Sequence, residues 1–235
     1  MRRPFQMKQF AIEQGDVTLP VTTDACLFGA LIQCSGNESI IDAGTGTGLL
    51  CLMLAQRYPG IHCTGVELDE TTAVQARANA ESSPFADRIE IWQADVLELP
   101  RNSIWDMVVC NPPFFANQLP SVNARKRQAR HTVSLDFDSL AGAMVGWVKP
   151  DGKIWLLLPP EGMQQMQGLL QPMGFEITAS ISIRSLESRP VHTMVACFEQ
   201  GVSKNIRMEI LTTYNAPGEY TEQAADLLAP FYLHL

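Results

Sequence analysis

Along most of the chain, short runs of apolar residues alternate with longer segments in which apolar and polar residues are mixed periodically. Short apolar runs, each ending in a glycine, proline or acidic residue, are typical of buried strands. Between them lie segments in which apolar residues recur every three or four positions, as on one face of a helix. The expected strands are 39–43, 61–66, 89–94, 107–110, 153–160, 175–183 and 191–198, with 207–211 as an additional one. The expected helices are 25–34, 49–57, 69–82, 135–148, 161–173 and 220–235.

This alternation predicts an α/β fold with a mostly parallel sheet and helices on both faces. The strands 175–183 and 191–198 are expected to form the antiparallel hairpin that closes such a sheet. A length of 235 residues fits one domain. Within it we expect an N-terminal lid segment (1–37), a core (38–200) and a C-terminal extension packed on the core (201–235). Asp24 is expected to cap the first helix.

A glycine-rich turn follows the first buried strand. The residues Asp42-Ala43-Gly44-Thr45-Gly46-Thr47-Gly48 lead directly into the helix 49–57, so the pattern is strand, glycine loop, helix. Glycines allow a ligand to approach the backbone closely, and the first turn of a helix offers unpaired N–H groups. The spacing differs from the dinucleotide pattern G-x-G-x-x-G. An acid in front of the glycines would repel a pyrophosphate but favour a cationic or hydroxyl-rich ligand.

Two further strands also end in acids. Glu67 follows the second strand at the spacing at which an acid binds the ribose hydroxyls of an adenosine in dinucleotide folds. Considered alone, Glu67 is more often a solvated residue at a strand end. Asp95 follows the third strand, where it is placed to bind an adenine amino group. Asp69 is expected to cap the helix after Glu67.

The fourth strand runs into Asn111-Pro112-Pro113-Phe114. Two consecutive prolines lack N–H donors and restrict the backbone, so the acceptors of this turn stay available. The Asn111 side-chain oxygen and the Pro112 carbonyl can together accept both hydrogens of a planar amino group, and Phe114 offers a face for the attached ring. Taken alone the four residues could form an ordinary loop; behind a glycine loop they indicate a site.

One dense basic run, 124–131, lies downstream of this turn and contains Arg125, Lys126, Arg127 and Arg130. Such a run is usually a solvated surface, but its position beside the aromatic turn favours phosphate contact. A second basic locus contains Arg189 and His192. His192 alone is more often a residue on the face of a strand than a catalyst.

Composition limits the possible functions. With 17 Lys and Arg against 25 Asp and Glu, the net charge is −8, which argues against a protein that coats nucleic acid by bulk attraction. The six cysteines form no C-x-x-C pair, which predicts reduced thiols and no zinc site. The densest apolar run, Ile154 to Leu158, is too short to span a bilayer. We expect a soluble, unprocessed, cytoplasmic monomer without a metal or a membrane contact.

The motifs together resemble those of class I S-adenosylmethionine-dependent methyltransferases that act on exocyclic or amide nitrogens. The resemblance extends over nearly the whole chain to the bacterial tRNA(Val) adenine-N6 methyltransferases, which modify adenine 37 beside the anticodon. It rests on the glycine loop, Glu67, Asp95 and the Asn111 turn, together with Lys8-Gln9-Phe10, Thr23-Asp24, Arg127-Gln128-Ala129-Arg130, Arg189-Pro190-Val191-His192 and Phe231-Tyr232-Leu233. The chain departs from the family at Phe114, where Tyr is commoner, and at Thr22, where Gly is commoner.

The resemblance implies a Rossmann-like class I methyltransferase fold with a seven-stranded, mostly parallel sheet. It implies S-adenosyl-L-methionine as the cofactor and the anticodon loop of a tRNA as the partner. The implied catalytic residues are Asn111, Pro112 and Phe114. The implied cofactor-binding residues are Thr23, Asp24, Asp42, Gly44, Thr45, Gly46, Gly48, Glu67, Leu68, Asp95 and Asn111. The implied substrate-binding residues are Phe114, Arg125, Lys126, Arg127, Arg130, Arg189 and His192.

Other functions remain open at this point. The same turn could methylate a guanine N2 in ribosomal RNA, an adenine in DNA or a glutamine amide in a protein, and Phe114 also resembles the guanine-N2 enzymes. A different class of function is a catalytically silent binding module on the same fold, which the acidic balance and the apolar C-terminal end would suit. The intact Asn111-Pro112-Pro113 turn argues against it.

Overall fold

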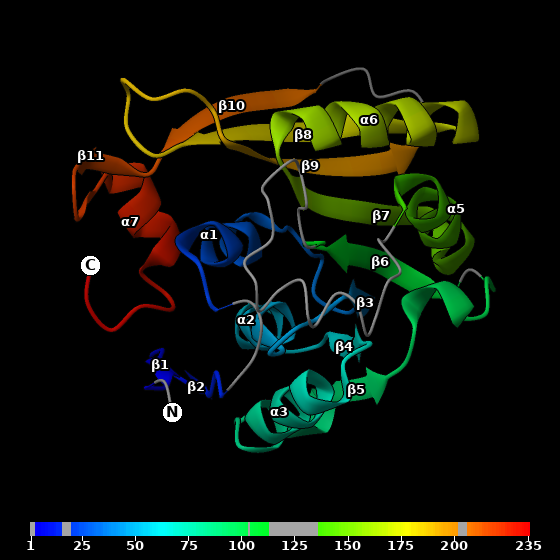
Figure 1. Ribbon diagram of the computed structural model, residues 1–235, viewed down its shortest axis with the longest axis horizontal. Coiled ribbons are helices and arrows are strands. Elements are labelled where there is room, and N and C mark those ends of the chain that lie inside the picture. Colours follow the sequence, from blue (N-terminus) through cyan, green and yellow to red (C-terminus); the bar gives the residue numbers. More distant parts are fainter. Residues whose placement is uncertain (1–2, 16–19, 103, 113–135, 202–205) are drawn as a thin grey trace, which may run out of the picture.

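The structure is a computed structural model in which residues 3–15, 20–102, 104–112, 136–201 and 206–235 are described. Its centre is an eight-stranded sheet with the order β10-β8-β9-β7-β6-β3-β4-β5 (Figure 1). The strands are β3 (Ser39–Ala43), β4 (His62–Glu67), β5 (Ile89–Gln93), β6 (Trp105–Cys110), β7 (Val148–Leu158), β8 (Phe175–Arg184), β9 (Thr193–Gln200) and β10 (Arg207–Thr212). Within this sheet β9 runs antiparallel to both of its neighbours, and the other strands share one direction.

Helices cover both faces of the sheet. The helices are α1 (Thr23–Leu31), α2 (Leu49–Arg57), α3 (Glu70–Glu81), α5 (Phe137–Trp147), α6 (Pro160–Leu170) and α7 (Glu222–Leu228). Short 3-10 turns are η1 (Ala86–Arg88), η2 (Val96–Glu98) and η3 (Gln171–Met173), and two small hairpins pair β1 (Phe5–Gln6) with β2 (Ala11–Ile12) and β11 (Tyr214–Ala216) with β12 (Glu219–Tyr220).

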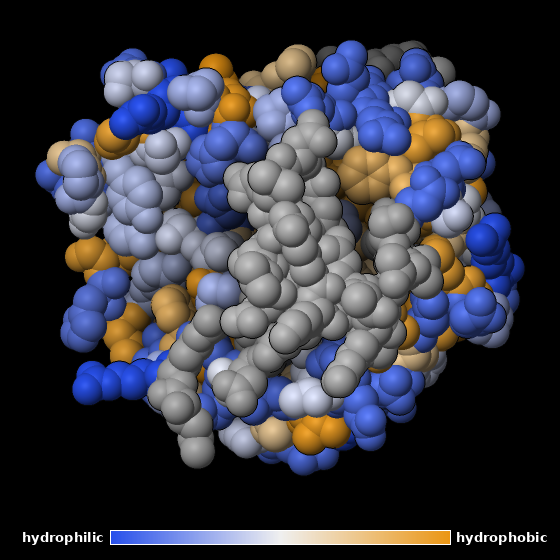
Figure 2. All heavy atoms as spheres, in the orientation of Figure 1, coloured by the Kyte–Doolittle hydropathy of each residue, from blue (hydrophilic) through white to orange (hydrophobic). Residues whose placement is uncertain are grey.

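The sheet is buried on both sides, as expected for parallel strands between helices. In β3 the adjacent residues Ile40 and Ile41 are both fully buried but belong to different core clusters. The first cluster contains apolar residues of α1, α2 and α7, and the second those of α5 and α6. On the face seen in Figure 2 hydrophilic residues are interspersed with hydrophobic ones. Most of the large apolar side chains therefore serve the two cores.

The predicted α/β alternation is confirmed, and α2 has the predicted bounds. Asp69 caps α3 as predicted, because its Oδ1 accepts from the Thr72 N–H at 2.8 Å. The prediction that Asp24 caps the first helix is wrong. Thr22 is the cap, with its Oγ1 accepting from the Ala25 N–H at 3.2 Å, so α1 begins two residues earlier than predicted.

Two differences concern the C-terminal part of the chain. The sheet has eight strands rather than seven, because β10 pairs in parallel with β8 and extends the edge. The predicted helix 220–235 is confined to Glu222–Leu228. Pro230 cannot continue a helix, and the turn at Gly218, with a φ of +83°, places the hairpin β11–β12 before it.

Two further observations concern the cysteines and the helices. All six cysteines are free thiols, and five of them are buried. Among the described residues, no helix is both long and apolar enough to cross a bilayer. No group of three or more His, Cys, Asp or Glu side chains that could hold a metal ion occurs in the described part of the chain.

Candidate cofactor and methyl-transfer site

The glycine loop connects β3 to α2, and the described residues leave open space beside two of its glycines. Gly44 and Gly46 have φ values of +76° and +57°, a backbone conformation that residues other than glycine rarely adopt. A Cβ at either position would meet no atom of the described residues within 4 Å. A Cβ at Gly48 would instead contact Ala76 of α3. Gly44 and Gly46 therefore border a space that a ligand can enter, whereas Gly48 lets two helices pack.

Asp42 lies beneath this loop with almost no exposed surface, at 1%. Its Oδ2 accepts a hydrogen bond from the Thr45 hydroxyl at 2.7 Å, so Thr45 points to Asp42 rather than outward. Its Oδ1 has no hydrogen-bond partner among the described residues. Burial raises the pKa of Asp42 to about 7. A buried, unpartnered carboxyl oxygen is costly, which fits a ligand donor reaching it.

Glu67 joins the glycine loop to the start of α3. Its Oε2 accepts from the Gly46 N–H at 3.1 Å and its Oε1 from the Asp69 N–H at 2.9 Å. Burial raises the pKa of Glu67 above its usual range. Each carboxylate oxygen still has a second lone pair, so the group can also accept from two hydroxyls of a ligand. The backbone N–H groups hold the carboxylate in place for that contact.

Leu68 and Asp95 lie next to Glu67 along the same edge. Leu68 is exposed, and its carbonyl oxygen accepts from Gln93 Nε2 at 3.2 Å. Asp95 Oδ1 accepts from the Leu97 N–H at 2.9 Å and caps η2. Asp95 is half-buried at the end of the connection from β5. The cap fixes the direction in which its carboxylate points.

Asn111 and Pro112 follow β6 directly. Ala43 of β3 pairs with Cys110 of β6, and the Cys110 thiol donates to the Ala43 carbonyl at 3.1 Å. Asn111 is therefore next to the start of the glycine loop, where it is half-buried, and Pro112 is buried. Pro113 to Leu135 lie outside the described residues. That range includes Phe114, Arg125, Lys126, Arg127 and Arg130.

The structure brings Thr23, Asp24 and His192 together. Asp24 Oδ2 lies 2.9 Å from His192 Nε2 and accepts from the Thr193 hydroxyl at 3.3 Å. The Thr23 hydroxyl is hydrogen-bonded to the Tyr214 hydroxyl at 3.3 Å. The start of α1 is thus attached to the beginning of β9 and to the hairpin after β10. Arg189 is exposed in the connection between β8 and β9.

Sequence reasoning missed Tyr214 and Thr193 as neighbours of α1. Pro217-Gly218 is a turn signal that could have placed Tyr214 in a hairpin. No local pattern indicates that the hairpin contacts Thr23, which lies 191 residues earlier in the chain. The contact of His192 with Asp24 joins residues 168 positions apart, and only the closed sheet makes it visible.

Asn111, the glycine loop, Glu67 and Asp95 form a row along one edge of the sheet. The strands β6, β3, β4 and β5 are neighbours, and their carboxyl ends carry Asn111, the glycine loop, Glu67 and Asp95 in that order. With neighbouring strands about 4.8 Å apart, the row spans roughly 14 Å. Ligands of open α/β sheets bind in this position, outside the carboxyl ends of the strands. The row can hold an extended ligand with a polar group at each strand.

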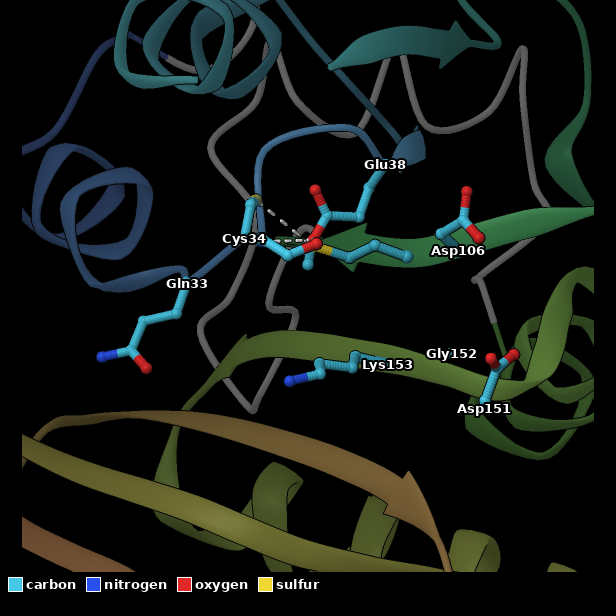
Figure 3. Close-up of a pocket in the computed structure, with 9 residues that line it drawn as sticks. Gln33, Cys34, Glu38, Asp106, Asp151, Gly152 and Lys153 are labelled. Carbon is cyan, nitrogen blue, oxygen red and sulfur yellow. Dashed lines mark hydrogen bonds between the residues drawn. The ribbon is translucent and has the colours of Figure 1, made fainter. Parts of the chain in front are cut away.

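A pocket of about 420 Å³ lies at the opposite edge, where the amino ends of β3, β6 and β7 meet (Figure 3). Two of the three acids that line it, Asp106 and Glu38, already have partners. Asp106 accepts from Lys149 Nζ at 2.6 Å and from the Ser39 N–H at 2.9 Å, and Glu38 accepts from the Gly36 N–H at 2.8 Å. The row at the carboxyl ends is therefore the better candidate for the reaction site.

Comparison with known proteins decides the family. The family described as Methyltransferase small domain matches residues 25–134. A protein of Pedobacter heparinus named tRNA1(Val) (adenine(37)-N6)-methyltransferase is 32% identical over 233 residues, which cover 99% of each chain. A protein of Dyadobacter fermentans with the same name is 34% identical over 232 residues, 97% of each chain. The chain belongs to this family of class I methyltransferases.

Solved structures support the fold of this methyltransferase. A crystal structure described as a predicted O-methyltransferase from Agrobacterium tumefaciens superimposes with a TM-score of 0.70 at 18% identity, covering 88% of this chain and 96% of that one. At that identity the likeness concerns the fold alone. The Rossmann-like class I methyltransferase fold expected from the motifs is confirmed.

Proposed function

We propose that this methyltransferase transfers a methyl group from S-adenosyl-L-methionine to the exocyclic N6 of adenine 37 in tRNA1(Val). The observation that carries the proposal is the similarity of this chain to relatives named for that reaction, over essentially the whole length of both chains. The position of Asn111 beside the glycine loop supports it from the structure.

The residues of the row fit S-adenosylmethionine. The open space at Gly44 and Gly46 allows its methionine part to approach the loop backbone, and the unpartnered Oδ1 of Asp42 can accept from a donor there. Glu67 would accept from the ribose hydroxyls, and Asp95 would bind at the adenine. Thr23, Asp24 and Leu68 would complete the binding site. Thr45 would act through Asp42, and Gly48 would act indirectly, by letting α2 pack against α3. When bound, the cofactor supplies an electrophilic methyl group.

Asn111 and Pro112 would position the acceptor amine. The lone pair of an adenine amino group is delocalised into the ring, so this amine is a weak nucleophile. The Asn111 side-chain oxygen and the Pro112 carbonyl would accept hydrogen bonds from its two N–H groups and favour the pyramidal geometry of the attacking nitrogen. The amine becomes strongly acidic as its new bond forms, so no strong base is needed. The contribution of the chain is mainly positional and electrostatic.

The target base must leave the stack to reach Asn111. An unpaired purine of an anticodon loop costs little to unstack. Phe114 would stack on the base, for roughly 1–3 kcal/mol. Arg125, Lys126, Arg127 and Arg130 would contact the phosphates. Arg189, exposed near the same edge, would add a further charge there, while His192 contacts Asp24 and would reach RNA only with its remaining exposed side.

The test uses two transcripts of tRNA1(Val) that differ at one base. The wild-type transcript carries adenine 37, and the control carries guanine 37. We expect methyl transfer from labelled cofactor to the first, with N6-methyladenosine as the product, and none to the second. Equal labelling of both transcripts would refute adenine 37 as the target, and methylation at guanine N2 would favour the alternative chemistry that Phe114 resembles.

A further inference from the structure

The strand β10 ends the sheet and has one unpaired edge. Its other edge pairs with β8, and the Thr213 N–H donates to the Arg184 carbonyl at 2.9 Å. Backbone groups of a strand point alternately to its two sides. The N–H and C=O groups of Arg207, Glu209 and Leu211 therefore face β8. Those of Met208 and Ile210 face away from the sheet, as does the carbonyl of Ile206 just before the strand, and none of the described strands pairs with them.

This edge also exposes apolar side chains. Ile206, Met208 and Ile210 are 51%, 75% and 59% exposed and lie on one face, whereas Leu211 on the other face is buried. Edge strands are commonly protected by proline, lysine or a bulge. The stretch 206–212 has no proline, glycine or lysine, and its pairing with β8 is regular. The combination of open backbone groups and an apolar stripe is typical of a strand that pairs with another chain.

The two charges of β10 determine which partner strand fits. Arg207 Nε lies 2.6 Å from Glu209 Oε1, and both point to the face opposite the apolar stripe. In an antiparallel pair with a twofold axis at Met208, Arg207 lies opposite Glu209 of the second copy. Ile206 then lies opposite Ile210 of the second copy. The strand is therefore complementary to itself in charge and in apolar contact.

Neighbouring registers lack this complementarity. An axis at Arg207 would place Arg207 opposite itself, and an axis at Glu209 would place two carboxylates together. Like charges directly opposite each other destabilise a strand pair. If one strand slid by a single residue along the other, backbone groups that face the second copy would lie opposite groups that face β8, so they could not form hydrogen bonds. The axis at Met208 is the register that satisfies charge, apolar contact and hydrogen bonding together.

We propose that the chain forms a twofold homodimer in which β10 pairs in antiparallel orientation with β10 of a second copy, with Met208 on the axis. Backbone hydrogen bonds join Met208 to Met208 of the second copy, and Ile206 to Ile210 of the second copy. The side chains of these residues form an apolar stripe on one face of the pair. On the other face, Arg207 and Glu209 of both copies form a network of four charges. This dimer replaces the monomer expected from the sequence. It does not depend on the proposed reaction.

A charge swap tests the register. Sedimentation velocity over a range of concentrations gives the dissociation constant of the wild-type dimer. Arg207→Glu or Glu209→Arg places like charges opposite each other and should weaken the dimer on the order of tenfold. The double variant R207E/E209R restores opposite charges and should restore the dimer. Glu90→Arg, an exposed position on the other edge strand β5, is the matched control and should not change it.

Cross-linking tests the axis independently. In this register Met208→Cys places two introduced thiols opposite each other, so a short bismaleimide should join them. Ile210→Cys places them several residues apart and should yield little linked dimer, and the wild-type protein controls for the native cysteines. A monomeric mass at every concentration would overturn the proposal. A double variant as weak as the single ones, or equal cross-linking of Met208→Cys and Ile210→Cys, would overturn the register.

Discussion

Replacing Glu67 with glutamine should weaken cofactor binding strongly. The Glu67 carboxylate accepts from the Gly46 and Asp69 N–H groups at 3.1 and 2.9 Å. In Glu67→Gln one oxygen becomes an NH₂ group, which would face a backbone N–H and could not accept from a ribose hydroxyl. A hydrogen bond to a charged group contributes about 1.5–3 kcal/mol. Loss of one such bond to the ribose raises Kd on the order of 10- to 100-fold.

Isothermal titration with S-adenosylmethionine measures this change. Glu81→Gln, an exposed position at the end of α3, is the matched control and should bind as the wild type does. Circular dichroism and thermal unfolding establish that both variants are folded. A folded Glu67→Gln protein whose Kd lies within about twofold of the wild type would refute the role of Glu67.

Three further predictions concern the reaction, the buried acid and the RNA. Asn111→Ala should leave cofactor binding largely intact but reduce turnover at least about 100-fold, which corresponds to roughly 3 kcal/mol of transition-state stabilisation. Near-normal turnover in single-turnover assays would contradict the role of Asn111. Burial raises the pKa of Asp42 from 3.8 to about 7. Between these pH values the folded chain keeps a proton on Asp42 that the unfolded chain has lost, so the stability of the folded state falls as pH rises through this range. Relative to the wild type, Asp42→Asn should therefore gain thermal stability as pH rises, and a difference in Tm independent of pH would refute this. Replacing Arg127 and Arg130 with glutamine should lower the salt dependence of tRNA binding by roughly two phosphate contacts, and an unchanged slope would place the RNA elsewhere.

Local patterns predicted the parts of the fold that local physics determines. Short apolar runs and glycine positions located β3, the glycine loop and α2, since a buried strand and a tight turn constrain those residue types directly. The Asp69 cap was also predictable, because its side chain binds an N–H three residues later. At α1 two capping residues, Thr22 and Asp24, lie close together, and the pattern alone did not distinguish them.

The candidate site was predictable as a set of strand ends but not as a set of contacts. Parallel strands bring their carboxyl ends to one edge, so the order of the strands in the sequence was enough to group Asp42, Glu67, Asp95 and Asn111. The bond from Glu67 to the Gly46 N–H depends on how two loops pack, and residue spacing does not determine that packing. The contact between His192 and Asp24 likewise depends on β9 entering the sheet beside β7.

Locating the methyl group in RNA tests the proposed reaction most directly. Total RNA from a strain lacking this gene is incubated with the protein and labelled S-adenosylmethionine, and the modified nucleoside is mapped. We expect label in tRNA1(Val) as N6-methyladenosine at position 37, and no label with Asn111→Ala. Label in ribosomal RNA, or label that occurs in protein alone, would contradict the proposed reaction.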